Sequence, residues 1–146
     1  MAKFKYRMQN ILDIKTKLET QAQNEYGIAN RKYLEEQAAL QELMIRRVEY
    51  EKSLKELVEG MLDIKSINNA RNDVNNIKTL VRRQMMEVHK AEIVLEKTRN
   101  ELNEKMKERK THEKLKEHAL DEFKADLQMA ETKEIDELVS YTFNGK

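Results

Sequence analysis

The near absence of helix-breaking residues restricts the fold of this chain more than any other feature. Its 146 residues contain no proline and only 3 glycines, whereas average usage would give roughly 7 prolines and 10 glycines. Folds built from many strands need a turn about every dozen residues, and turns depend on these two residue types. The sequence therefore excludes sandwiches, barrels and doubly wound sheets, and it predicts an all-α protein with very few turns.

Two series of residues recur in alternating steps of three and four, which is the spacing of a coiled-coil core. The first series runs from Ala22 to Ile64, and the second runs from Ala70 to Leu102. Each series predicts one long helix that buries a single stripe. The core residues that we expect in these stripes are Ala22, Ala29, Tyr33, Leu40, Leu43, Tyr50, Leu54, Val74, Ile77, Val81, Val88, Leu95 and Leu102.

A turn between the two series is expected near residues 60–63. Gly60 is the residue type preferred just past a helix end, and Asp63 can cap the helix that follows. Antiparallel pairing about this turn places Leu43 opposite Val81, which matches apolar to apolar. A shift of one heptad, with the turn in the asparagine-rich stretch 68–76, matches the pattern as well, so the register stays open by one heptad.

These observations predict a long two-helix antiparallel coiled-coil hairpin with a C-terminal helical extension. The first helix is expected over about 4–59 and the second over about 63–140, and together they form a single elongated coiled-coil domain over 1–146. The second helix is the longer one, so about its last 20 residues extend past the paired region.

Sequence patterns for catalysis or metal binding are missing. There is no cysteine, and His89, His112 and His118 do not have the spacing of three or four that places two ligands on one helix face. Three isolated glycines cannot form a phosphate-binding loop, and a two-helix hairpin offers no deep pocket. We therefore expect no enzymatic activity, no cofactor and no metal.

The charges balance overall but not locally. The net charge is +1, yet residues 1–17 carry five bases and one acid while residues 119–146 carry three bases and seven acids. Bases also gather between Lys65 and Lys90, but without the aromatic residues that stack on single strands, so we expect no nucleic-acid partner. No apolar run reaches the length of a membrane span or of a signal-peptide core, which predicts a cytoplasmic protein.

Apolar residues outside the two series exceed what one partner helix can cover. They indicate a protein-binding surface, and a third helix or self-association is the alternative. The seam alone predicts a chain that is monomeric in isolation. The residues concerned are Leu34, Met44, Ile45, Val48, Leu80, Met85, Met86, Ile93 and Val94.

Three motifs together resemble the signatures of the bacterial flagellar export protein family FliJ. The first is the opening FKYRMQNILDIK of residues 4–15, where an aromatic pair precedes a basic residue. The other two are KTHEKLKE at 110–117 and ETKEIDE at 131–137. The chain length and the Gly60 break fit as well, so the resemblance covers the whole chain.

The resemblance implies a non-enzymatic, stalk-like component of the flagellar type III protein export apparatus. The paired termini would enter the central opening of the hexameric export ATPase FliI, promote assembly of its ring and couple it to the export gate protein FlhA. Carried over motif by motif, the ATPase contact falls on Phe4, Tyr6, Arg7, Lys15, Glu113, Leu115, Asp136 and Glu137.

The resemblance also implies a gate contact at the start of the second helix, around Asp73, Ile77, Leu80 and Gln84. Relatives usually carry aromatic residues where this chain has Ala70 and Asp73, so the gate contact departs from the family pattern. Export chaperones are further candidate partners. The expected location is the cytoplasmic face of the inner membrane at the flagellar base, reached through partners only.

Three other classes share part of this pattern. The homologous stalk protein of a virulence type III secretion system has the same architecture. A prefoldin-like chaperone also uses a helical hairpin, but it needs strands between its helices, and the segment 59–66 is too short for them. A dimeric scaffold would form one continuous helix, which Gly60 disfavours.

Overall fold

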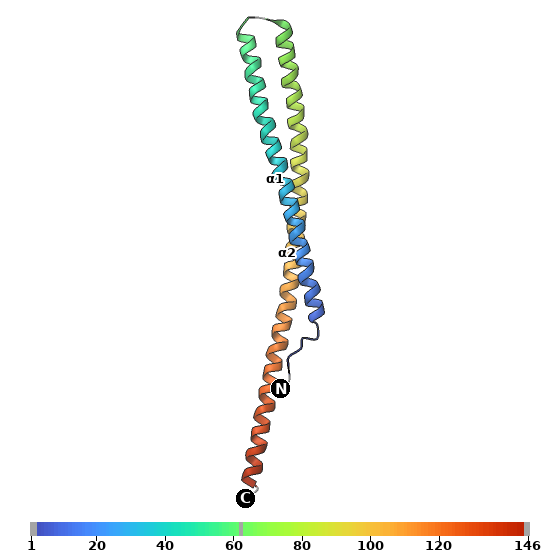
Figure 1. Cartoon of the computed structure of the whole chain (residues 1–146), viewed down its shortest axis with the longest axis vertical. Coiled ribbons are helices and arrows are strands. Elements are labelled where there is room, and N and C mark those ends of the chain that lie inside the picture. Colours follow the sequence, from blue (N-terminus) through green and yellow to red (C-terminus); the bar gives the residue numbers. More distant parts are fainter. Residues whose placement is uncertain (1–2, 62, 145–146) are drawn as a thin grey trace. The chain divides into compact units, whose positions relative to one another are not determined.

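Two long helices make up almost the whole chain in the computed structural model, which describes residues 3–61 and 63–144 (Figure 1). Helix α1 spans Gln9–Glu59 and helix α2 spans Ile64–Asn144, and the described residues form no strand. The helices run antiparallel: Tyr26 of α1 lies beside Arg99 of α2, and Glu36, later in α1, bonds to Gln84, earlier in α2. The predicted all-α antiparallel hairpin is confirmed.

The connection between the helices is short and capped. The Gly60 amide donates to the Glu56 carbonyl at 3.0 Å as the last bond of helical type, and α1 ends at Glu59. At the start of α2, the Asp63 carboxylate accepts hydrogen bonds from the Lys65 amide at 3.2 Å and the Ser66 hydroxyl at 2.7 Å. These bonds, led by the one from Ser66, lower the pKa of Asp63 because they stabilise its charged form. The chain therefore does not form the one continuous helix that a dimeric scaffold requires. Leu62, inside the predicted turn, lies outside the described residues.

Helix α1 begins at Gln9, later than the expected residue 4. The preceding residues alternate basic and aromatic side chains, and a period of two suits an extended segment better than a helix. In that segment Phe4 and Tyr6 are half-buried, whereas Lys3, Lys5 and Arg7 are exposed. Alternation therefore sends the two aromatic side chains inward and keeps the charges in water.

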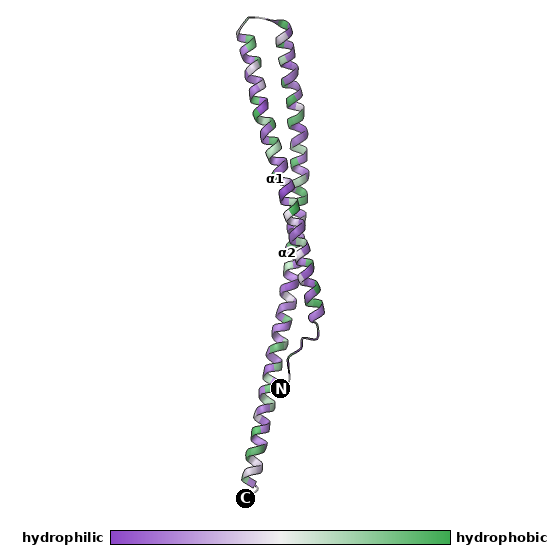
Figure 2. Ribbon diagram, viewed as in Figure 1, coloured by the Kyte–Doolittle hydropathy of each residue, from purple (hydrophilic) through white to green (hydrophobic). Residues whose placement is uncertain are grey.

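The chain divides into two compact units. Unit 2 is Ala22–Leu102 and contains most of the buried seam. Ala22, Ala29, Val74, Ile77, Val81 and Leu95 of the predicted core are buried there, as is Ala91. Tyr33, Leu40, Leu43, Leu54, Val88 and Leu102 are half-buried. Figure 2 shows hydrophobic and hydrophilic residues alternating along both helices, as a single buried stripe requires.

Tyr50 differs from the other predicted core residues because 39% of its surface is exposed. The seam of unit 2 is formed by two helices, so a small side chain is covered while a large ring reaches past its only partner. Spacing alone places Tyr50 on the seam, but its size places it at the rim.

Unit 1 combines Met1–Gln21 with Asn103–Lys146, of which residues 3–21 and 103–144 are described. Leu12 is buried in it, and so is the charged Glu19, which is only 7% exposed. Beyond Phe123, every described residue of α2 is exposed, from Lys124 to Asn144. This stretch is the predicted C-terminal helical extension.

Candidate functional site

The aromatic pair at the start of the chain packs against α2 within unit 1. The Phe4 and Phe123 rings are 5.5 Å apart between centroids and tilted by 49°, and this separation lies within the favourable range for an aromatic pair. The Tyr6 hydroxyl is buried and has no hydrogen-bond partner among the described residues. Arg7 is exposed beside them. Of these three predicted ATPase contacts, Arg7 is therefore the one whose side chain is exposed to solvent.

A network of ion pairs follows about two helical turns further along α1. Lys15 Nζ lies 3.2 Å from Glu108, and buried Glu19 bonds to Arg109. Arg109 also reaches Glu113 at 2.8 Å. The bond from Lys15 lowers the pKa of Glu108, while Glu19 and then Glu113 raise the pKa of Arg109. Each shift favours the charged form, so this part of unit 1 is held by charge-assisted hydrogen bonds.

This network engages two of the predicted ATPase-binding residues. Lys15 is half-buried and Glu113 is exposed, but both charges already have partners inside unit 1. A partner protein would have to compete with those ion pairs. Arg7, by contrast, has no acid within 4.0 Å among residues 3–61 and 63–144.

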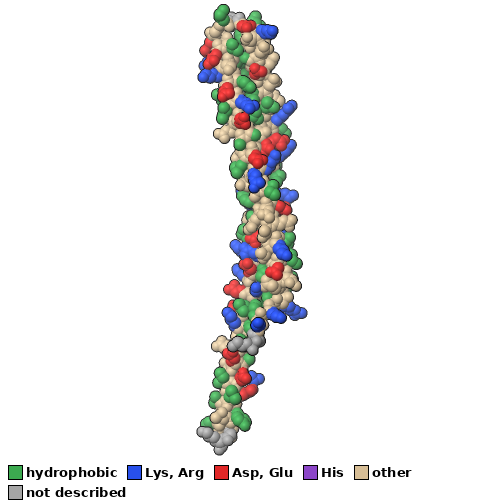
Figure 3. Space-filling model, in the orientation of Figure 1, with side chains coloured by type: hydrophobic (Ala, Val, Ile, Leu, Met, Phe, Trp, Pro, Cys, Tyr) green, Lys and Arg blue, Asp and Glu red, His purple; other side chains and the backbone are tan. Residues whose placement is uncertain are grey.

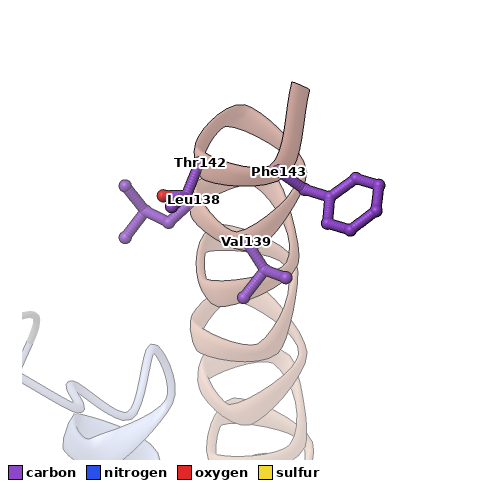
Figure 4. A pocket seen from close by; sticks show the side chains of 4 residues that line it. All are labelled: Leu138, Val139, Thr142 and Phe143. Atoms are coloured by element: carbon purple, nitrogen blue, oxygen red, sulfur yellow. The ribbon is translucent and has the colours of Figure 1, made fainter. Parts of the chain in front are cut away.

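The remaining predicted ATPase contacts lie on the exposed part of unit 1. Leu115 is 47% exposed, and Asp136 and Glu137 are exposed on the C-terminal extension. Near the end of the extension, Leu138 and Phe143 point in different directions from the helix (Figure 4). With Val139 and Thr142 they line a shallow, open pocket on the surface of one helix, which suits docking on a larger partner better than enclosing a small molecule.

The four predicted gate contacts do not share one surface in unit 2. Asp73 is exposed and Leu80 is 44% exposed, but Ile77 is only 3% exposed in the seam. Gln84 is half-buried and donates to the Glu36 carbonyl at 2.9 Å. Ile77 therefore contributes to the core and cannot contact a partner while the helices stay paired.

Sequence reasoning missed the buried charges of unit 1. Continuing the steps of three and four backward from Ala22 reaches Glu19, Lys15 and Leu12, and continuing forward from Leu102 reaches Arg109. All four are buried or half-buried. The spacing was present, but a search for apolar residues stops where the seam becomes ionic.

Neither a metal cluster nor a membrane span is found in the part of the chain that the structure describes. Within residues 3–61 and 63–144, no group of three or more His, Cys, Asp or Glu side chains is arranged to hold a metal ion. In the same residues, neither helix has a stretch apolar and long enough to cross a bilayer.

Comparison with known families settles the resemblance carried by the three motifs. The family model described as "Flagellar FliJ protein" matches residues 4–146. The chain belongs to the FliJ family. No curated protein and no solved structure gives a match. Membership makes the chain a component of the flagellar protein export apparatus, and it favours that interpretation over the virulence-system and prefoldin-like alternatives.

Proposed function

We propose that this FliJ-family chain binds the hexameric flagellar export ATPase FliI through unit 1 and promotes assembly of its ring. The observation that carries the proposal is the coincidence of two independent features in unit 1. All eight residues that match the family's ATPase-contact motifs belong to this unit, and Arg7, Leu115, Asp136 and Glu137 among them are exposed.

The chemistry of this surface supports a protein partner. Arg7 offers a planar cation that can pair with a carboxylate, and Asp136 and Glu137 offer anions on the extension. Leu115 adds an exposed apolar side chain. Exposed charges of both signs together with an exposed apolar side chain are typical of the surfaces through which proteins bind one another and dissociate.

We further propose that unit 2 links the ATPase to the export gate FlhA, with Asp73 and Leu80 as the contact residues. Gln84 would take part only if it released Glu36, and Ile77 would act by holding the helix in place. Export chaperones are candidate partners of the same complex. These contacts would bring the chain to the cytoplasmic face of the inner membrane.

The test is a pull-down of purified FliI in lipid-free buffer, together with the ATPase rate and electron micrographs of the rings. Arg7→Glu should weaken binding and reduce stimulation of the ATPase, whereas Lys55→Glu, an exposed lysine of unit 2, should leave both unchanged. Equal binding by the two variants, with unchanged helical content, would contradict a contact through unit 1.

A further inference from the structure

Helix α2 carries a basic face that neither the seam nor the proposed protein contacts use. Its cations lie between residues 64 and 93. At 3.6 residues per turn, they fall within about half of the helix circumference, and the three acids of this stretch fall on the rest. The basic face consists of Lys65, Arg71, Lys78, Arg82, Arg83 and Lys90; the acids are Asp73, Glu87 and Glu92.

Most of the basic face points away from α1. Val74, Ile77 and Val81 are buried and mark the side of α2 that packs in the seam. Arg83 and Lys90 lie on the opposite side and are exposed, Arg71 and Arg82 are exposed between the two sides, and Lys78 is half-buried nearer the seam. Figure 3 shows Lys and Arg side chains recurring along the right-hand edge of unit 2. This side of the helix is free to meet a partner along its whole length.

The cations are mostly uncompensated. Lys90 pairs with Glu87 at 3.3 Å. The other five have no acid within 4.0 Å in the part of the chain that the structure describes. Like charges gathered on one face repel one another, and ordinary protein surfaces intersperse the two signs. An anionic partner would relieve that repulsion.

Apolar side chains stand between these cations. Met85 is 49% exposed, Met86 is 62% exposed and Ile93 is 56% exposed, all on or beside the same face. Exposed apolar side chains flanked by lysine and arginine can lie against a membrane surface. There the cations meet lipid phosphates while the apolar side chains enter the headgroup and acyl boundary.

We propose that the basic face of α2 binds the surface of an anionic lipid bilayer. It would add a direct membrane contact to the one made through partner proteins. A flat, extended partner fits because the cations are spread along about 40 Å of one helix side, at 1.5 Å per residue. The face has no aromatic residue for stacking on nucleic-acid bases. Its apolar side chains alternate with charges, whereas a protein interface has an apolar centre within a polar rim.

The test is sedimentation of the full chain with vesicles of 30% phosphatidylglycerol in phosphatidylcholine, and with phosphatidylcholine alone. We expect binding to the anionic vesicles only, and its loss in 0.5 M salt. Arg71→Gln/Arg82→Gln should lower the partition coefficient about 30-fold, because each cation near such a surface contributes about 1 kcal/mol. Lys52→Gln/Lys55→Gln, which removes the same charge from exposed positions on α1, should retain binding.

Several results would overturn the proposal. The two double variants could lose vesicle binding equally. The chain could bind neutral vesicles as well as anionic ones, or it could bind neither kind of vesicle. Capture of polyglutamate or RNA in place of vesicles would assign the face to an acidic protein or to nucleic acid, and would overturn it too. Helical content by circular dichroism checks that each variant folds. The proposal does not depend on the ATPase contact, because its residues lie in unit 2 and the ATPase assay contains no lipid.

Discussion

Val81 is the least exposed of the buried core residues, at 2%, while its neighbour Leu80 is 44% exposed. This adjacent pair gives a matched test of the seam. Val81→Asp places an unpaired carboxylate between the two helices and should cost several kcal/mol of unfolding free energy. Leu80→Asp should cost less, about 1 kcal/mol, because the side chain is already 44% exposed. Thermal melts followed by circular dichroism measure both, and similar melting temperatures would mean that the buried stripe is wrongly placed.

Glu36 makes the seam sensitive to acid. The bond from Lys32 and then the bond from Gln84 lower the pKa of Glu36. A carboxyl whose pKa is lowered on folding contributes stability above its unfolded pKa, and that contribution disappears as the pH falls through the lower folded value. The wild type should therefore have a higher melting temperature than Glu36→Gln at pH 7, and this difference in melting temperature should shrink at pH 4 and 3. A difference that stays constant down to pH 3 would assign the effect of the substitution to packing.

At the scale of the elements, helix α1 contains a glycine whose low helix propensity is not offset by any packing contact. Gly27 lies inside α1 and is exposed, and a Cβ built on it meets nothing within 4 Å. No described residue of the free chain therefore needs the space that the missing Cβ leaves. Gly27→Ala should stabilise the protein by about 1 kcal/mol, because glycine loses more backbone entropy in a helix than alanine does. An unchanged or lower melting temperature would contradict this account.

The pairing of the two elements in unit 1 depends on a buried charge. Arg109→Met leaves Glu19, which is 7% exposed, without its guanidinium. Breaking a buried pair from one side costs more than replacing both partners with apolar residues of similar size. The single variant should therefore have a lower melting temperature than the double variant Glu19→Leu/Arg109→Met. Additive effects of the two substitutions would show that the pair is not coupled.

These elements also show what the sequence could and could not predict. Steps of three and four correctly placed Ala29, Val81 and Leu95 on the seam, because apolar residues that repeat with the helical period lie on the buried side of a helix. The same rule failed at the first helix start, where a short period-two segment replaced helix. It also stopped short of Glu19, since a buried ion pair is recognisable only once both partners are seen together. The eight ATPase-contact residues came from family motifs and remain predictions.

Across the whole molecule, burial is divided unequally. Unit 2 holds seven buried apolar residues, while unit 1 holds Leu12 and Glu19. From Lys124 onward no described residue is even half-buried. Helices without tertiary contacts are marginal in water, and local opening is most frequent where apolar contacts are few.

Hydrogen exchange should therefore be slowest around Val74–Leu95, intermediate where Leu12 and Glu19 pack, and fastest from Lys124 to Asn144. Binding of FliI should slow exchange in residues 3–21 and 103–144 and leave Val74–Leu95 unchanged, since protection follows the contact. Anionic vesicles should instead act on the basic face of α2. Exchange that slows equally along the chain with either partner would contradict the assignment of separate surfaces to the ATPase and to the membrane.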